Sequence, residues 1–445
     1  MIEICTIGGY SEVGKNMTAV KVDEEVVIFD MGVFLPKIIN FEEEGGDRRD
    51  LTTDGLIKLG AIPDDTVIKH WKGKVKAIVF THCHLDHVAA APYLGNNYPK
   101  APMIGTPFTI EVLKRMVRDD GIDLKNKFKV LNVNSKIKIT KNLEVEFINM
   151  THSTPQTVMI ALHSKYGTVI YANDFKFDNN PVVGKKPNLE RLKELGKENV
   201  VALIVDSLYS QRDGKTPSEK VAREMLKDVM LGTESSENLI IATTFASHIA
   251  RLKSMIDFGK VLNRKIVFFG RSLEKYIDSA EKAGLVKFSN QVEIIPQKND
   301  IIKKLREIEK QGRAKYMIVC TGNQGESESV LKKMADSRIP FHFLPFDHVI
   351  FSCRTIPEHV NIKNRERLEE ELKKKKVRIF TDIHSSGHCF REDLRDLIHM
   401  VKPKNIFPAH VPPDGQKYLV ELAEELGYKK NKNVFVSENG VFRKI

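Results

Sequence analysis

The sequence has few cysteines and no long apolar segment. Its five cysteines are scattered over 445 residues, and no two of them form a Cys-x-x-Cys pair. This argues against a disulfide-stapled fold and for a reducing cytoplasm. No run of 18 apolar residues occurs, and the first residues lack a basic stretch followed by an apolar one. We therefore expect no membrane span and no signal peptide.

The chain carries more positive than negative charge. Lysine and arginine number 70 against 59 acidic residues, which gives a formal net charge of +11. Such an excess favours a polyanionic partner such as nucleic acid, although ordinary charge for solubility would give the same balance. The length and the 41% hydrophobic content suit a globular protein of two or three domains.

Short apolar segments separated by polar turns dominate the first 180 residues. They predict a strand-rich region with few helices, of which residues 109–118 form one. The acidic, glycine-containing stretch 37–55 is predicted to be an exposed loop. The expected strands cover residues 2–7, 18–22, 26–30, 75–80, 143–149, 157–162 and 168–172.

Strand-like and helix-like segments alternate between residues 207 and 360. This alternation predicts a parallel sheet flanked by helices, and therefore a separate domain. Loops that carry histidine return after it, so we expect three parts: residues 1–206, 207–360 and 361–445. The alternating pairs are 239–243 with 247–261, 265–269 with 273–283, 292–295 with 301–311, and 316–320 with 327–335.

Residues 81–87 read Thr-His-Cys-His-Leu-Asp-His and follow an apolar run. Four side chains that bind metals, His82, His84, Asp86 and His87, fall within six positions. Extended backbone alternates its side chains, so His82 and His84 point the same way. Asp86 and His87 follow as the chain turns and can face a second ion. Imidazole with carboxylate suits zinc, with manganese or iron as alternatives.

The alternative interpretation of this cluster is three histidines that are solvated or packed in a core. A single histidine would favour it, whereas three histidines with an aspartate favour a metal site. Further ligands should be histidine or aspartate at strand ends. His152, Asp174 and His410 each follow a strand-like segment, although such residues also cap strands or face solvent.

These motifs resemble the metallo-β-lactamase fold and, within it, the β-CASP nucleases of the ribonuclease J family. Asp30, the cluster at 82–87, His152 and Asp174 match the motifs of the fold in order. The resemblance implies an α/β protein, a metallo-β-lactamase αββα sandwich with an inserted β-CASP domain. The length is similar to that of the shorter archaeal members. The segments closest to ribonuclease J are Gly8–Met17, Asn173–Asp178, Thr321–Glu326 and His384–His388.

The resemblance implies two zinc ions per subunit, with manganese as the alternative metal. Two such ions lower the pKa of a water molecule and bind the scissile phosphate, while Asp86 accepts the proton. Asp30 would orient a ligand imidazole from behind. The ligands would be His82, His84 and His152 for one ion, Asp86, His87 and His410 for the other, and Asp174 between them.

The same resemblance implies a proton donor for the leaving 3′-oxygen. His388 would take this role with Asp206 as its partner, because a carboxylate keeps a neighbouring imidazole protonated. Taken alone, Asp206 is better explained as a cap after a strand, and His388 as a residue before the helix 391–401. Contacts to substrate phosphate, for which a simple turn or cap is an equal alternative, are expected from Ser247, His248, Ser386, Gly387 and His388.

The expected function is that of a zinc-dependent ribonuclease in RNA processing and decay. The resemblance implies that it is mainly a 5′→3′ exonuclease that prefers 5′-monophosphate ends. A β-CASP endoribonuclease or a DNA-processing hydrolase would use the same two-metal site. The inserted domain and the positive charge oppose a small-molecule metallohydrolase, and the complete ligand set opposes a non-catalytic RNA-binding protein. RNA is the expected partner, a homodimer is implied by the resemblance, and the expected location is cytoplasmic.

Overall fold

The computed structural model describes residues 1–47 and 50–445, which divide into two units. Unit 1 comprises Met1–Asn179, Lys185–Thr216 and Ser386–Ile445, and unit 2 comprises Asn180–Gly184 and Pro217–Ser385. Unit 2 thus interrupts unit 1 in the sequence. The range 207–360 expected for the inserted part overlaps unit 2 and ends before it does.

The first sheet of unit 1 has the strand order β19-β1-β2-β3-β4-β5-β6. Strands β19, β1, β2 and β3 pair antiparallel with one another, whereas β3 to β6 run parallel. Parallel β3 and β4 place their carboxyl ends at one edge of the sheet. The strands are β1 (Ile2–Gly8), β2 (Met17–Val22), β3 (Glu25–Phe29), β4 (Val75–Val79), β5 (Met103–Gly105), β6 (Phe128–Val130) and β19 (Val441–Lys444).

The second sheet of unit 1 has the order β18-β11-β10-β9-β8-β7. β7 to β10 are antiparallel, whereas β10, β11 and β18 are parallel. The pairing of Asp206 with Ala409 in this parallel part joins residues that are far apart in sequence. The strands are β7 (Lys136–Lys138), β8 (Glu144–Asn149), β9 (Val158–Ser164), β10 (Gly167–Ala172), β11 (Val200–Asp206) and β18 (Ile406–Ala409).

The two sheets of unit 1 face each other across one apolar core. Alternate residues of β2 to β4 pack against alternate residues of β8 to β11 in a single buried cluster. Phe29 and Tyr171, one from each sheet, stack with ring centroids 5.1 Å apart. Because a strand sends alternate side chains to opposite faces, the other face of each sheet needs cover from helices.

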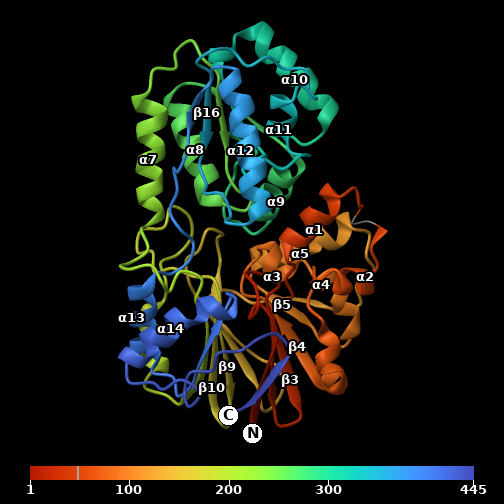
Figure 1. Cartoon of the computed structure of the whole chain (residues 1–445), viewed down its shortest axis with the longest axis vertical. Helices are drawn as coiled ribbons and strands as arrows, with labels where there is room; N and C mark the ends of the chain where they lie inside the picture. Colours follow the sequence, from red (N-terminus) through yellow and green to blue (C-terminus); the bar gives the residue numbers. More distant parts are fainter. Residues whose placement is uncertain (48–49) are drawn as a thin grey trace. The chain divides into compact units, whose positions relative to one another are not determined.

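Helices cover both outer faces of this sandwich. Leu394, Leu397, Ile398 and Val401, spaced as one face of a helix, pack α13 on the second sheet. Figure 1 shows α3 to α5 beside the first sheet. The predicted αββα sandwich is confirmed. The helices of unit 1 are α1 (Leu35–Glu43), α2 (Thr53–Lys58), η2 (Asp65–Lys74), α3 (Leu85–Val88), α4 (Ala91–Leu94), η3 (Gly95–Asn97), α5 (Pro107–Asp119), α6 (Leu189–Leu195), α13 (Arg391–Val401) and α14 (Pro413–Glu425).

The prediction of an exposed loop over residues 37–55 is wrong at residues 37–43 and 53–55, which are helical, whereas residues 44–47 form a turn and an irregular stretch. Residues 48 and 49 lie beyond the described part. Helices α1 and α2 occupy most of this stretch. Only Ile38 is buried in α1 and only Leu56 in α2, so neither helix leaves an apolar period in the sequence. A local cap supports α2, because Thr52 accepts a hydrogen bond from the backbone N–H of Gly55. The expectation of few helices in the first 180 residues is wrong for the same reason.

Unit 2 is a parallel sheet with helices on both faces. Its strands follow the order β14-β13-β15-β12-β16-β17, and every adjacent pair is parallel, which confirms the prediction from the alternating pattern. Residues of α10, α11 and α12 pack on one face, and Figure 1 shows α12 beside β16. The elements are β12 (Ile240–Thr243), β13 (Lys265–Phe269), β14 (Glu293–Ile295), β15 (Tyr316–Cys320), β16 (His348–Phe351), β17 (Arg378–Phe380), α7 (Glu219–Gly232), α8 (Ile249–Val261), α9 (Arg271–Lys282), α10 (Lys298–Gln311), η4 (Arg313–Lys315), α11 (Val330–Ala335) and α12 (His359–Lys374).

Within residues 1–47 and 50–445, every helix is too short or too polar to cross a membrane. The five cysteines, all within this part, are free and buried. A disulfide scaffold is therefore absent from the described residues, as the scattered cysteines predict.

A buried ion network ties helix α6 to the second sheet of unit 1. Glu146 on β8 receives hydrogen bonds from Arg191 Nε at 2.8 Å and Arg191 Nη2 at 3.1 Å, and its Oε2 lies 2.8 Å from His163 Nε2. Burial alone would raise the pKa of Glu146, but the hydrogen bonds from His163 and Arg191 outweigh it and lower the pKa to about 2. The charged form of Glu146 therefore stabilises the folded state.

Glu146→Gln is expected to lower the free energy of unfolding by about 1–3 kcal/mol at pH 7. The folded pKa is depressed, so this stability is present above the unfolded value of about 4.3 and is lost as pH falls toward about 2. Urea unfolding at a series of pH values measures it. Glu144→Gln, on the same strand with only a distant lysine partner, should change stability by less than about 0.5 kcal/mol. Equal losses in both variants, or a loss independent of pH, would refute the network's role.

Candidate metal centre

Polar side chains gather where the parallel strands of unit 1 end. Asp30 follows β3, Asp174 follows β10 and His410 follows β18. All three residues have left-handed backbone, with φ of 56°, 56° and 61°. Such conformations cost about 1–3 kcal/mol each in residues other than glycine and concentrate at functional sites. The backbone at these strand ends is therefore shaped to hold the side chains.

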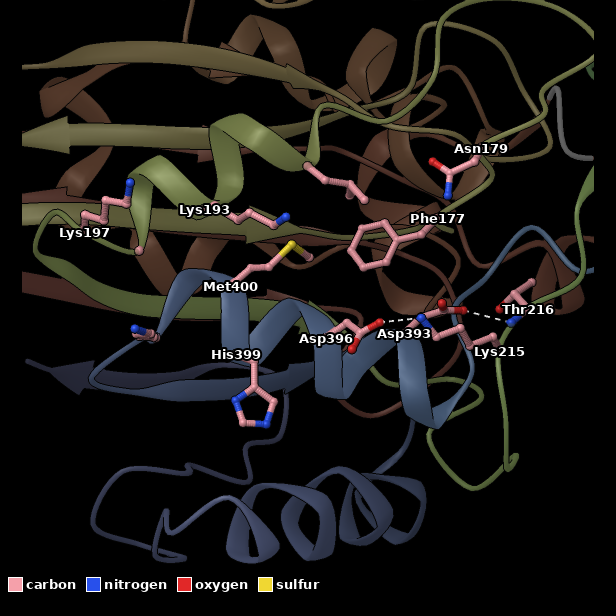
Figure 2. Close-up of a pocket in the computed structure, with 13 residues that line it drawn as sticks. Phe177, Asn179, Lys193, Lys197, Lys215, Thr216, Asp393, Asp396, His399 and Met400 are labelled. Atoms are coloured by element: carbon pink, nitrogen blue, oxygen red, sulfur yellow. Dashed lines mark hydrogen bonds and ion pairs between the residues drawn. The ribbon is translucent and has the colours of Figure 1, made fainter.

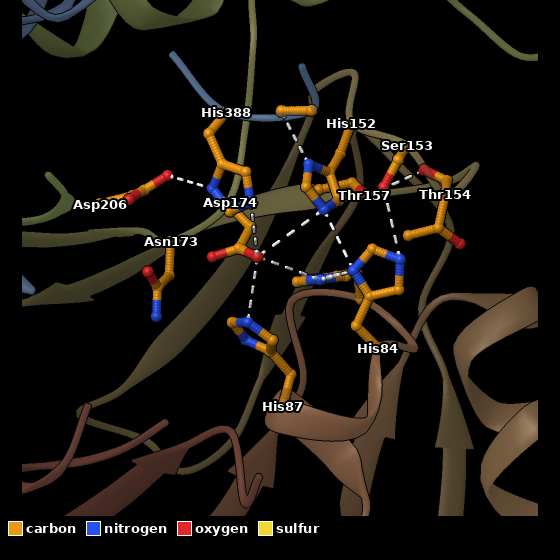
Figure 3. A network of polar contacts seen from close by, with 12 residues as sticks. His84, His87, His152, Ser153, Thr154, Thr157, Asn173, Asp174, Asp206 and His388 are labelled. Carbon is orange, nitrogen blue, oxygen red and sulfur yellow. Dashed lines mark hydrogen bonds and ion pairs between the residues drawn. The ribbon is translucent and has the colours of Figure 1, made fainter. Parts of the chain in front are cut away.

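The cluster at residues 82–87 supplies half of a histidine-rich group. His84 Nδ1 lies 3.0 Å from His82 Nε2 and 3.1 Å from His152 Nε2. Asp174 Oδ2 lies 3.7 Å from both of those Nε2 atoms. Figure 3 shows the rings of His84 and His152 directed at Asp174. His82, His84, His152 and Asp174 each offer one ligand atom, and these atoms all lie within 4.8 Å of one another.

A second group shares Asp174 with the first. The short helix α3 carries Asp86 and His87, and His87 Nε2 lies 3.3 Å from Asp174 Oδ2 and 3.4 Å from Asp86 Oδ2. His410 completes the group, with Nε2 3.9 Å from Asp86 Oδ2 and Nδ1 3.7 Å from Asp174 Oδ1. The seven residues that the sequence singles out therefore converge on one point in unit 1, in two groups joined by Asp174.

The tautomers of the histidines suit a metal. His152 Nδ1 lies 2.7 Å from the carbonyl oxygen of Gly387, which can only accept, so Nδ1 carries the proton. His152 Nε2 therefore keeps its lone pair toward His84. His87 Nδ1 likewise lies 2.8 Å from the Asp30 carboxylate, which orients the ring so that Nε2 faces Asp174. Backbone carbonyls and carboxylates behind ligand imidazoles orient them in this way in metal sites.

The charges of the two groups differ. Burial and the neighbouring histidines hold the pKa of His82 well below its usual range, and burial lowers the pKa of His84 to about 4. Burial and His84 likewise hold the pKa of His152 well below its usual range. These three imidazoles are therefore neutral, the form that binds metals.

Buried carboxylates surround His87. Burial opposes its charge, but Asp174, Asp86 and Asp30 outweigh burial and hold the pKa of His87 well above its usual range. The Oδ1 atom of Asp174 is buried and accepts no hydrogen bond within the described residues. Three carboxylates around one imidazole favour positive charge at this position, which the His87 imidazolium supplies and a metal ion would supply in its place. The donor set therefore fits a metal centre in its geometry, tautomers and charge.

Asp30 lies behind this centre, as expected. It is fully buried, and its oxygens accept hydrogen bonds from the backbone N–H and the hydroxyl of Thr81, each at 2.8 Å. Its Oδ2 also accepts from His87 Nδ1. Asp30 thus fixes both the ring of His87 and the loop that begins at Thr81.

Asn16, which the sequence does not distinguish from other asparagines, connects three parts of the centre. It is 1% exposed, and its Nδ2 donates to the Asp86 carbonyl at 3.0 Å. Its Oδ1 lies 3.1 Å from His410 Nδ1 and accepts from Asn173 Nδ2 at 3.0 Å. Its place in the glycine-flanked segment Gly8–Met17 is the one signal that points to it.

Two glycines allow the backbone to approach the centre closely. A Cβ atom on Gly32 would lie 1.6 Å from the Asp86 carbonyl oxygen, and one on Gly387 would lie 2.7 Å from the His152 ring. Any side chain at either position would displace the residues of the centre. Gly387 therefore positions His152, in addition to the phosphate contact expected from the sequence.

His388 and Asp206 form a pair at the edge of the centre. His388 Nδ1 lies 2.7 Å from Asp206 Oδ2, and Nε2 lies 3.9 Å from Asp174 Oδ2 (Figure 3). The His388 side chain is 19% exposed, whereas that of Asp206 is 1% exposed. Burial lowers the pKa of His388, but Asp206 and Asp174 outweigh burial and raise it to about 9. The imidazole is therefore a proton donor near neutral pH.

The residues expected to contact phosphate fall into both units. In unit 1, Ser386 Oγ accepts a hydrogen bond from the His388 backbone N–H at 3.0 Å. In unit 2, Ser247 and His248 precede α8, and His248 Nε2 lies 3.3 Å from Glu219 Oε2. Glu219 is in turn held by the fully buried Arg251. The phosphate role of these residues stays a prediction.

Three family models match the chain in succession. Residues 11–230 match the metallo-beta-lactamase superfamily, residues 237–365 match the ribonuclease J beta-CASP domain, and residues 374–437 match the Zn-dependent metallo-hydrolase RNA specificity domain. The chain is 43% identical over 440 residues to ribonuclease J of Methanocaldococcus jannaschii, covering 99% of this chain and 98% of that one. The chain belongs to the ribonuclease J family.

Other members of the ribonuclease J family are similar over nearly the whole chain. Ribonuclease J of Pyrococcus abyssi is 42% identical, with 99% of this chain and 96% of that one covered. Ribonuclease J 1 of Streptococcus pyogenes is 31% identical, with 99% and 73% covered. A solved structure of an Enterococcus faecalis protein of unknown function has a TM-score of 0.66 at 16% identity, with 99% of each chain covered. The last likeness concerns the fold alone.

Proposed function

We propose that this chain is a metal-dependent ribonuclease. It hydrolyses RNA phosphodiesters, mainly as a 5′→3′ exonuclease on 5′-monophosphate ends, in RNA processing and decay. The observation that carries the proposal is the convergence of two ligand groups on Asp174, next to the pair of His388 and Asp206. Membership of the ribonuclease J family supports RNA as the substrate class, and so does the net charge of +11.

The two groups would hold two zinc ions, with manganese as the alternative. Such ions, when bound, lower the pKa of a water molecule and polarise a phosphate. One set of protein ligands consists of histidines alone, and the other adds a carboxylate. The assignments are His82, His84 and His152 for one ion, Asp86, His87 and His410 for the other, and Asp174 for both.

Asp86 accepts the proton of the attacking water in this proposal. Its side chain is 26% exposed, whereas that of Asp174 is 2% exposed and that of Asp30 is fully buried. Asp86 is therefore the carboxylate of the centre that solvent and substrate can reach. Asn16 fixes the backbone carbonyl of Asp86, so the carboxylate keeps its place during the reaction.

His388 protonates the leaving 3′-oxygen. Its Nδ1 is bonded to Asp206, so Nε2 carries the mobile proton on the side of the centre. Positioned acids of this kind contribute about 10²–10⁴-fold to a rate. Asp206 holds the ring and favours its protonated form, and the backbone of the same loop orients His152 through Gly387.

Incubation of the protein with 5′-monophosphorylated RNA tests this function. One RNA sample carries its label at the 3′ end and a parallel sample carries it at the 5′ end. The zinc-loaded protein should release mononucleotides from the 5′ end, and a chelator should stop the release. Asp86→Ala should be inactive, whereas Asp120→Asn, on a surface turn after α5, should be as active as wild type. Internal fragments from circular RNA would favour a β-CASP endonuclease, and cleavage of DNA but not RNA a DNA-processing hydrolase. The absence of any metal-dependent cleavage of RNA would refute the proposal.

The proposal includes a homodimer in the cytoplasm, for which the family resemblance is the support. Light scattering of the purified chain checks the first part, because a dimer has twice the mass of the 50.6 kDa chain. A mass that stays at one chain across concentrations would refute the dimer and leave the nuclease proposal untouched.

A further inference from the structure

A cavity of about 610 Å³ opens between α6 and α13 of unit 1 (Figure 2). Cavities of roughly 300–1,000 Å³ are the size that binds small molecules. The proposed metal ligands, His388 and Asp206 all lie outside its lining, so the cavity is a different site from the centre described above. Lysines, aspartates and a few apolar side chains form most of its lining.

Part of the lining is apolar. Phe177, Leu189 and Met400 are each half-buried, so part of each side chain stays open to the cavity. Figure 2 shows the ring of Phe177 facing into the space between the two helices, close to the side chain of Met400. Phe175 packs against Phe177 with ring centroids 5.3 Å apart, which holds the ring in place. An aromatic ring beside a thioether is a surface on which a flat, apolar ring can stack.

The rest of the lining has a surplus of positive charge. Lys193, Lys197 and Lys402 are exposed at the cavity, and none of them forms an ion pair with the described residues. The two aspartates of the lining are already engaged. Asp393 is buried and accepts from the Thr216 backbone N–H at 2.8 Å, and Asp396 pairs with the fourth lysine of the lining, Lys215. Three cations are therefore available to an anionic ligand.

We propose that this cavity binds a nucleotide unit: a phosphate at the lysines and a base against Phe177. The phosphate would be the anionic partner of Lys193, Lys197 and Lys402. Stacking on an aromatic ring holds a base whatever its identity. The amide of Asn179 lies in the same lining and can bond to base or sugar edges. The nucleotide is a free mononucleotide or one unit of an RNA chain. An acidic peptide satisfies the lysines but leaves the aromatic surface without a flat partner.

This proposal does not rest on the proposed function, because binding is measured without cleavage. Thr216 nevertheless connects the cavity to the centre. Its backbone N–H donates to Asp393 on the cavity wall, while its hydroxyl donates to the His388 carbonyl and accepts from the Phe390 N–H, each at 2.9 Å. A ligand in the cavity therefore contacts the segment that holds the His388 loop.

Methyl NMR of the full chain with labelled methionine tests the proposal at the cavity itself. Met400 is one of 13 methionines, and Met400→Leu assigns its signal. AMP, added to chelator-treated protein, should shift the Met400 signal until the site is saturated. Adenosine, which lacks the phosphate, should bind at least tenfold more weakly. The pair Lys193→Gln and Lys197→Gln should weaken AMP binding at least tenfold. The matched pair Lys185→Gln and Lys186→Gln, which removes the same charge outside the lining, should leave it unchanged.

The outcomes separate the sources of the ligand. If AMP and a five-nucleotide RNA bind with the same affinity, the ligand is a free mononucleotide. If the RNA binds much more tightly than AMP, the ligand is one unit of an RNA chain. Both results support the proposal. It is overturned if the Met400 signal does not move with AMP or RNA, if both lysine pairs have equal effects, or if a glutamate-rich peptide shifts the signal while nucleotides do not.

Discussion

Asp174→Asn is expected to reduce RNA cleavage by at least ~10³-fold, because the variant loses a charge that both ligand groups share. The asparagine keeps the size of the side chain but presents an amide to the surrounding histidines. Asp174 contacts His87 at 3.3 Å and His82 and His152 at 3.7 Å, so a single substitution affects both groups. Metal analysis after gel filtration should show a loss of bound zinc together with the loss of activity.

The matched control for Asp174→Asn is Asp65→Asn. Asp65 is also a buried aspartate of unit 1, but it accepts hydrogen bonds from Asn97 and from the hydroxyl of Tyr98. Neither partner belongs to the two ligand groups. Its replacement should lower stability and leave the zinc content and the cleavage rate of folded protein as in wild type. Full zinc content with full activity in Asp174→Asn would contradict the shared role of this carboxylate.

His388→Ala is expected to reduce RNA cleavage by about 10²–10⁴-fold without changing the zinc content. The reason is that His388 belongs to neither of the two four-residue groups that share Asp174, although it lies close to Asp174 and Asp206 at their edge. Asp206→Asn should cost less, about 10–100-fold, since it removes only the partner that orients the ring. Rates on 5′-monophosphorylated RNA, measured with metal analysis of the same samples, check both expectations.

A substrate with an easily displaced group identifies the role of His388. In the thymidine 5′-phosphodiester of 4-nitrophenol, the leaving group is 4-nitrophenolate, a stable anion that needs no proton donor. His388→Ala should therefore lose less than about tenfold on this substrate. Asp174→Asn should lose activity equally on both substrates. An equally large loss on both substrates in His388→Ala would indicate a role in binding phosphate or in structure, not in proton transfer.

The candidate site follows from local signals in the sequence to a large extent. His82, His84, Asp86 and His87 form one short motif, and the apolar run before them marks a strand that ends at a sheet edge. Parallel pairing then explains why distant residues join them. β10, β11 and β18 run parallel, so Asp174, Asp206 and His410 emerge at one edge although unit 2 lies between them in sequence. The seven residues that the sequence singles out and the structure brings together are His82, His84, Asp86, His87, His152, Asp174 and His410.

The features that the sequence did not reveal have no apolar periodicity or depend on contacts between residues far apart in sequence. Asn16 bonds to residues 70 and 394 positions away, and no local pattern encodes such contacts. Helices α1 and α2 bury a single residue each, and only α2 has a capping side chain, so neither shows an apolar period in its sequence. The cavity between α6 and α13 depends on which faces of two helices meet, a property of packing that neither helix shows alone.

Titration of the metal-free protein with zinc, followed by the rate of RNA cleavage, tests the central claim most directly. The proposed assignment of seven ligands in two groups predicts no cleavage without metal and a rate that rises until two equivalents of zinc are bound per chain. Asp174→Asn should bind less zinc and show no rise. Cleavage by the metal-free protein at the full rate, or full activity at one equivalent with no second ion bound, would contradict the two-metal ribonuclease.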